Sequence, residues 1–192
     1  MIILCFSKNV LSNNEPELKS HFGIGLELSS WKPSTLDLKP TSLIKGIPGT
    51  SLNYGIVVVI RWFGDSALRT SFLEWTQSDL QDRTDVEMVR LRPLCLDLKN
   101  NIIRNTDLSP YVSYGVLFIW AAEKAIGVKN FPEGKSQFGY GASVGAGLDF
   151  KLSKHWTSGI EYQYWYAKLP NSIGLTDDYS GPKISLKVIF FF

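Results

Sequence analysis

The chain has 192 residues, enough for one domain or two small ones with a sizeable core. Its 20 basic and 18 acidic residues nearly cancel and form no basic cluster, so nothing points to a nucleic-acid partner. Aromatic residues make up 13% of the chain and glycine occurs 16 times, which is typical of many strands joined by turns.

The first 21 residues precede the first predicted strand, and we expect them to form an arm. They begin with MIILCFSKNV, which is too short for a complete signal peptide and lacks a basic leading region. If the protein is exported, its signal was removed or its true start lies upstream. No apolar run reaches the roughly 18 to 20 residues of a membrane helix. Cys5 and Cys95 form no metal motif and no disulfide framework, and we interpret them as unpaired thiols.

Five strands are predicted in the first two thirds of the chain, near 22–30, 51–62, 66–76, 86–98 and 110–121. In the fourth of these, the apolar residues change faces between Leu91 and Leu94. A bulge around Arg92-Pro93 would restore the alternation, because proline in a sheet prefers edges and bulges.

The clearest predicted strand is 138–152, in which every second residue is apolar from Phe138 onward. The residues between them are glycine, serine, Asp149 and Lys151. Two further strands, at 156–166 and 182–192, alternate in the same way. This period of two predicts strands with one apolar face and one small or polar face.

The links between these eight strands alternate in length. Long links fall at about 31–50, 122–137 and 167–181, and a medium one near 77–85. The links between the second and third strands, and between the sixth and seventh, are short. Long links at one rim and mostly short ones at the other predict an up-and-down barrel with two unlike ends.

The polarity of the two strand faces distinguishes a soluble ligand-binding barrel from a membrane barrel. In the sixth and eighth strands the glycines and charges share one face, which suits a narrow lumen better than a soluble surface. The opposite face carries no charge, as lipid requires, because a Lys or Arg at mid-bilayer costs about 2 to 4 kcal/mol. Aromatic residues near strand ends are predicted to form girdles at the membrane–water boundary: Trp31, Trp62, Trp75, Trp120, Trp156, Tyr111 and Tyr166. The predicted fold class is all-β, an eight-stranded antiparallel up-and-down transmembrane β-barrel.

The stretch GYGASVGAGLDFKLSKHWTSGIEYQYWY and the terminal strand ending in Phe190-x-Phe192 resemble the small OmpA/OmpX-like outer-membrane β-barrel proteins of Gram-negative bacteria. The resemblance covers 22–192 and implies a periplasmic arm at 1–21, a barrel at 22–192, and long loops outside the cell. It also implies that the barrel-assembly machinery reads the terminal strand, through Ile184, Leu186, Val188, Phe190 and Phe192. The family usually has a glycine in this strand, roughly where Lys187 lies here.

Seven charged residues are predicted to face the lumen: Glu27, Arg90, Arg92, Asp149, Glu161, Lys183 and Lys187. An eight-stranded barrel is just wide enough for side chains to fill, so a structural salt-bridge network is favoured over a conduction path. The glycines of GYGASVGAG do not match G-x-G-x-x-G, and we interpret them as lumen-facing rather than nucleotide-binding. Neither His21 nor His155 would lie at the outer rim, where some barrel enzymes keep a catalytic histidine. No catalytic residue, metal site or cofactor is predicted.

We therefore expect a non-enzymatic outer-membrane barrel that acts as a structural anchor, a surface-interaction protein or a subunit of a larger envelope complex. The alternative is a narrow channel or carrier for small or apolar solutes; a lipid-modifying enzyme and a soluble barrel rank below it. Expected partners are outer-membrane lipid and lipopolysaccharide, the barrel-assembly machinery, and an envelope protein that contacts the 31–50 loop or the N-terminal arm.

Overall fold

The computed structural model describes residues 22–34, 51–61, 65–77, 86–103, 107–127, 135–174 and 176–192. They form nine strands: β1 (Phe22–Trp31), β2 (Ser51–Arg61), β3 (Ser66–Gln77), β4 (Val86–Asn101), β5 (Leu108–Ala125), β6 (Ser136–Lys151), β7 (Trp156–Ile173), β8 (Thr176–Asp178) and β9 (Gly181–Phe191). Among these residues there is no helix long and apolar enough to cross a membrane. The arm predicted at 1–21 and most of the 31–50 loop lie outside the described residues.

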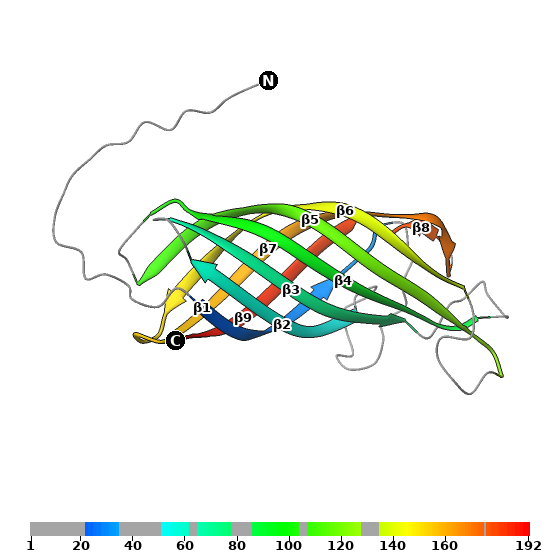
Figure 1. The fold of residues 1–192 in the computed structure, drawn as a ribbon, viewed down its shortest axis with the longest axis horizontal. Coiled ribbons are helices and arrows are strands. Elements are labelled where there is room, and N and C mark those ends of the chain that lie inside the picture. The colour runs from blue at the N-terminus through cyan, green and yellow to red at the C-terminus, as the bar shows by residue number, and fades with distance from the viewer. Residues whose placement is uncertain are drawn as a thin grey trace, which may run out of the picture.

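Eight of the strands close into a ring. β1 to β7 each pair antiparallel with the next strand in the chain, and β9 pairs with both β7 and β1. The three-residue β8 pairs with β7 only. The predicted eight-stranded antiparallel up-and-down barrel is confirmed, and Figure 1 shows its strands tilted in the same sense around the axis.

The two ends of the barrel differ, and we name them by what they hold. At the N/C end lie the start of β1, the end of β9 and the links from β2 to β3, from β4 to β5 and from β6 to β7. At the loop end lie the other links and β8, on the side opposite the C-terminus in Figure 1. Backbone hydrogen bonds tie the N/C-end links together, for example Asn101 N–H to Asp65 O (2.9 Å) and Phe191 N–H to His155 O (2.7 Å).

The polarity of the wall is inverted relative to a soluble barrel. In β1, Leu26 is 70% exposed on the outside whereas its neighbour Glu27 is 1% exposed in the lumen. The same alternation runs along β6, β7 and β9, whose outward side chains are mostly aliphatic or aromatic. Since an outward apolar face and an inward polar one are what a bilayer demands, the barrel is built to sit in lipid.

The bulge predicted around Arg92-Pro93 is wrong. β4 keeps one register with β3 from Asn100 through Val89, and the only shift along its pairing with β5 lies between Val86 and Met88. Pro93 takes an ordinary inward position in the alternation. Both faces of β4 carry leucine because the lumen beside its first half is itself apolar, so the change of face seen in the sequence does not need an extra residue.

The strands are also longer at the loop end than the sequence predicted. β5 continues to Ala125 and β7 to Ile173, beyond the expected ends at 121 and 166. Backbone hydrogen bonds extend these pairings, such as Glu123 N–H to Lys135 O (3.0 Å) and Tyr179 N–H to Ala167 O (2.8 Å). Alanine, proline, lysine, glutamate, asparagine and serine form most of these extensions, and residues of these types give little strand signal.

Candidate functional site

The middle of the lumen holds a buried network of ionised side chains centred on Arg69 of β3. Its guanidinium Nη2 lies 2.5 Å from Asp97 Oδ2 on β4 and 2.9 Å from Glu161 Oε1 on β7. All three side chains are 2% exposed or less. Arg69 therefore connects two carboxylates from opposite sides of the barrel. The positive guanidinium and the two negative carboxylates each offset part of the free-energy cost of burying the opposite charge.

Two lysines of β9 complete this network. Lys187 pairs with Glu161, and Lys183 pairs with Glu27 of β1. Each of these four residues is 3% exposed or less. The lysines lie four residues apart on the inward face of one strand, so β9 supplies two of the three cations of the network.

Uncharged donors hold the carboxylates in place. Ser113 donates to Glu161 (2.6 Å), and Asp97 accepts from Ser143 (2.5 Å) and from Cys95 Sγ (3.0 Å). Gln163 donates to Asp97 (3.1 Å), and its Oε1 accepts from the Trp165 indole (3.1 Å). A carboxylate that accepts several hydrogen bonds keeps its charge in a buried site. Cys95 is a free thiol within this set.

Glycines on the inward face leave the space that these long side chains occupy. A Cβ on Gly147 would lie 2.5 Å from the ring of Tyr111, and one on Gly159 would lie 2.7 Å from Asp149 Oδ1. Both positions face the lumen in β6 and β7. The glycines of the GYGASVGAG stretch are thus part of the lumen packing.

Five of the seven predicted lumen charges lie inside the barrel, and two do not. Glu27, Glu161, Lys183 and Lys187 belong to the network, and Asp149 pairs with Lys99 closer to the N/C end. Arg90 and Arg92 were placed in the lumen wrongly: they face outward on β4 and pair with Glu74 of β3. Their side chains are 24% and 35% exposed.

On β2, β3 and β4, sequence reasoning missed four inward charges: Arg61, Arg69, Asp97 and Lys99. It also missed Glu123 on β5, which lies beyond the predicted end of that strand. The first four lie on strands where apolar residues occur on both faces and the period-two pattern is weak. β4 has no bulge between Leu91 and Lys99, so Leu91, Asp97 and Lys99 all lie on its inward face. Counting along the strand in steps of two would have placed Asp97 and Lys99 on that face.

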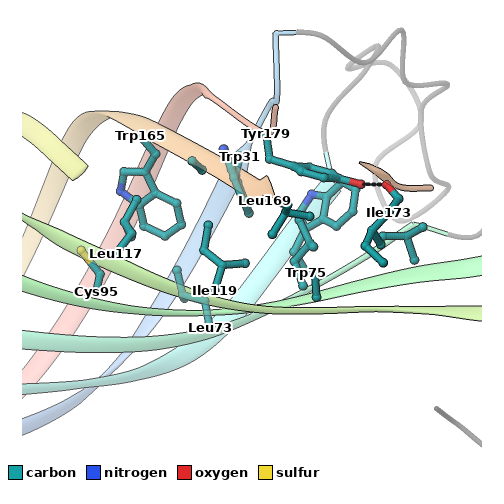
Figure 2. Close-up of a cluster of buried hydrophobic side chains, with 14 of the residues drawn as sticks. Trp31, Leu73, Trp75, Cys95, Leu117, Ile119, Trp165, Leu169, Ile173 and Tyr179 are labelled. Atoms are coloured by element: carbon teal, nitrogen blue, oxygen red, sulfur yellow. Dashed lines mark hydrogen bonds between the residues drawn. The ribbon is translucent and has the colours of Figure 1, made fainter. Parts of the chain in front are cut away.

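The loop end of the lumen is apolar. Figure 2 shows Trp31, Trp75 and Trp165 pointing inward from three strands, together with Tyr179, whose hydroxyl donates to Ile173 O (2.5 Å). The ring centroids of Trp31 lie 5.0 Å from Trp165 and 6.0 Å from Trp75. We call this group the loop-end cluster: Trp31, Leu73, Trp75, Val86, Val89, Leu91, Cys95, Leu117, Ile119, Ala121, Trp165, Ala167, Leu169, Ile173 and Tyr179.

The residues predicted to form the aromatic girdle divide into an outward-facing group and a lumen-facing group. Trp156 and Tyr166 are 46% and 50% exposed on the outer face, and Trp120 also faces outward, beneath the Arg92 guanidinium (5.0 Å from its ring centroid). Trp31, Trp75 and Tyr111 are 1% exposed in the lumen, so their assignment to the girdle is wrong. Trp62 lies outside the described residues. Large aromatic side chains near strand ends serve both as lipid contacts and as lumen packing, and position alone does not separate the two.

A second apolar group lies at the N/C end and consists of Val57, Val59, Ala67, Ile189 and Phe191. Along the barrel axis, therefore, an apolar group, an ion network and the larger loop-end cluster follow one another. Each is made of buried side chains.

The side chains proposed as an assembly signal share the outer face of the last strand. Ile184, Leu186, Val188 and Phe192 are between 38% and 63% exposed, and Phe190 is half-buried beside Trp156. Phe191 points the opposite way and is 3% exposed. This is the alternation expected of the signal; its recognition by assembly machinery stays a prediction.

One of the two histidines lies in the described part of the chain. His155 lies in the N/C-end link between β6 and β7, where its Nδ1 is 3.0 Å from Phe191 O, and His21 lies outside the described residues. The described part of the chain contains no group of three or more His, Cys, Asp or Glu side chains arranged to hold a metal ion.

Comparison with known proteins shows the fold but no close relative. No protein-family model matches the chain, and no curated protein matches it. Solved structures do. OprG of Pseudomonas aeruginosa is 14% identical with a TM-score of 0.66, and the match covers 90% of this chain and 96% of OprG. Neisserial surface protein A is 13% identical with a TM-score of 0.64, covering 89% and 97%.

Ail, the attachment invasion locus protein of Yersinia pestis, crystallised with the heparin analogue sucrose octasulfate, is 16% identical with a TM-score of 0.52, covering 90% and 97%. These are outer-membrane β-barrels that share this fold but only 13 to 16% of its sequence. The predicted resemblance to the small OmpA/OmpX-like outer-membrane barrels is therefore confirmed at the level of the fold.

Proposed function

We propose that this protein is a non-enzymatic barrel of the bacterial outer membrane that does not conduct, and that acts through its two rims as a surface-interaction protein or as an anchor within a larger envelope complex. The observation that carries this proposal is the filled lumen. Buried side chains occupy the barrel interior at the N/C end, in the middle and at the loop end.

The side chains that fill the lumen are held by contacts that oppose the opening of a pore. Arg69, Asp97 and Glu161 connect β3, β4 and β7 across the interior, so a continuous path would require several buried ion pairs to separate together. Above them, Trp31, Trp75 and Trp165 pack edge to face. Both layers favour a closed interior over the alternative, a narrow channel or carrier.

If the interior is closed, the barrel can contact a partner only through its outer surface and its two rims. On this proposal the N/C end faces the periplasm, the loop end faces the exterior, and the outward apolar face contacts outer-membrane lipid and lipopolysaccharide. The 31–50 loop and the 1–21 arm remain the candidate contacts for an envelope protein. The names of two structural neighbours, a surface protein and an attachment invasion protein, agree with a role at the cell surface.

Single-channel recording in planar bilayers tests the closed interior. We expect the refolded wild-type protein to insert, as judged by its heat-modifiable mobility on a gel, and to give no steady conductance steps. A porin with an open pore, inserted into the same bilayers, serves as the positive control. Reproducible steps from the wild-type protein would reject the proposal and restore the channel or carrier.

Co-purification in mild detergent tests the second part of the proposal, the contact with an envelope protein. An envelope complex predicts a stable protein partner, and deletion of residues 35–50 or of 1–21 should identify which rim holds it. If a partner is retained by both deletion variants, neither segment is the contact.

A further inference from the structure

A small cavity of about 30 Å³ lies inside the barrel at the N/C end, next to the ion network. Side chains of six strands and of the β2–β3 link line it, and most of them are polar. A space of this size has room for about two water molecules. The identity of its occupant therefore depends on the charges and the hydrogen-bonding groups of the lining.

The charges around the cavity balance. Four cations line it: Arg61, Arg69, Lys99 and Lys187. Four carboxylates offset them, two in the lining and two in ion pairs with Arg69 or Lys187: Asp65, Asp149, Asp97 and Glu161. Because no net charge is left over, the cavity favours a neutral occupant over an ion.

Two residues of the lining each have a buried polar atom that lacks a hydrogen bond. Arg69 Nε and Asn101 Oδ1 have no hydrogen-bond partner among the described residues. The first atom is a donor and the second is an acceptor. Burying either one without a partner costs free energy, so an occupant that bonds to both kinds of atom would stabilise the barrel. Water is a neutral molecule of the right size that can both accept and donate.

The contacts of Arg69 give such water a structural role. Its Nη2 lies 2.5 Å from Asp97 and 2.9 Å from Glu161, so both carboxylates are bound through one nitrogen of the guanidinium. Nε belongs to the same rigid plane. A hydrogen bond at Nε would therefore fix the rotation of that plane and keep Nη2 directed at the two carboxylates.

We propose that this cavity binds two ordered water molecules, with Arg69 Nε donating to one of them and Asn101 Oδ1 accepting from one of them. The bound water holds the Arg69 guanidinium in the orientation that the ion network requires, and water-mediated hydrogen bonds of this kind are nearly as favourable as direct ones. The site is confined to the N/C end, so it neither requires nor excludes a conducting lumen.

A crystal structure of the refolded barrel, at a resolution that shows ordered water, provides the test. We expect two water-sized peaks of electron density in the cavity. One or both should lie within hydrogen-bond distance of Arg69 Nε or Asn101 Oδ1, and Arg69 Nη2 should retain its two carboxylate contacts. Single-channel recording remains the separate test of the closed interior.

Two variants at one position test the acceptor. Asn101→Leu removes the side-chain oxygen at similar size, and the water that donates to it should be lost. Asn101→Asp keeps an acceptor oxygen at the same place and should retain that water. Both variants keep the backbone hydrogen bond from Asn101 N–H to Asp65 O. Heat-modifiable mobility confirms that each variant is folded.

An empty cavity in the wild-type structure would overturn the proposal, and so would density too large for water, such as an ion or an additive. Retention of both waters at unchanged positions in Asn101→Leu, or their loss in Asn101→Asp, would reject Asn101 as a ligand. If a variant does not fold, the wild-type density still decides.

Discussion

Arg69 shows how much one buried side chain determines in so narrow a barrel. It is the only described residue that joins the carboxylates of Asp97 and Glu161, and those carboxylates in turn organise Ser113, Ser143 and Gln163. A buried ion pair adds little net stability, but losing one member leaves a desolvated charge without compensation. Removing Arg69 is therefore expected to cost more stability than its ion pairs contribute on balance.

We expect Arg69→Met to lower the free energy of unfolding by about 3 to 5 kcal/mol, because Asp97 would remain buried without its cation. Urea titration of the barrel in lipid vesicles, followed by gel mobility, measures the change. The control is Arg92→Met, which breaks a pair that is 35% and 29% exposed and should cost about 1 kcal/mol or less. Equal losses in the two variants would mean that the interior network does not behave as buried.

The difference between strands with a clear polar face and strands with two apolar faces explains which inward charges could be predicted from the sequence. Lys183 and Lys187 were predicted inward because the outward face of their strand is purely apolar and the period of two is clear. Arg90 and Arg92 were misplaced because leucines flank them on both faces. Where the lumen is apolar, a strand no longer has a polar side, and hydropathy alone cannot say which way an arginine points.

At the level of elements, one physical fact accounts for the errors in β3 and β4. A membrane barrel was expected to be polar inside along its whole length. The loop-end half is instead filled by Leu73, Leu91 and the tryptophans, so both faces of these strands are apolar there. The apparent bulge and the misassignment of Trp31 and Trp75 to the girdle follow from that single difference.

The last strand permits a sharper experiment, because its two final phenylalanines face opposite ways. Phe192 is 63% exposed outside and Phe191 is 3% exposed inside. We expect Phe192→Ala to reduce the amount of barrel assembled in cells while changing the free energy of unfolding little. Phe191→Ala should lower that free energy by about 3 to 5 kcal/mol, because it empties a packed position.

Membrane fractionation with heat-modifiable mobility measures assembly, and urea titration of purified protein measures stability. Normal assembly of Phe192→Ala in cells would show that the terminal aromatic residue is not the recognised signal.

At the scale of the whole molecule, the outward belt determines where the barrel resides. Val144 lies near the middle of β6, opposite Tyr114 of β5 and Tyr164 of β7, and is 60% exposed. We expect Val144→Lys to destabilise the barrel in bilayers by about 2 to 4 kcal/mol, because it places a charge at mid-bilayer depth.

Ser136→Lys is the matched control, since Ser136 is exposed at the loop-end start of the same strand and a charge there should cost about 0 to 1 kcal/mol. Urea titration in vesicles compares the two. If both variants lose the same stability, the bilayer does not cover the surface around Val144.

The overall architecture was readable from the sequence to a greater extent than any individual site. The number of strands, their order and the inverted faces follow from the alternation in β1, β6, β7 and β9. The ion network was not readable in full, since Arg69 and Glu161 are 92 residues apart in the chain and meet only when the ring is closed. Such pairings depend on register and strand tilt, which the pattern of single strands does not contain.

The seam between β1 and β9 has a consequence for the order of events during folding. It brings Glu27 to Lys183, 156 residues away, and it pairs the first described strand with the last. Until β9 has paired with β1, β1 has an open edge and the lumen charges of β9 are missing. Contacts that span nearly the whole chain also make closure slow, because the entropy of a large loop is lost before they form. The chain must therefore be kept from aggregating until β9 pairs with β1. The closed ring then has no free edge at this seam.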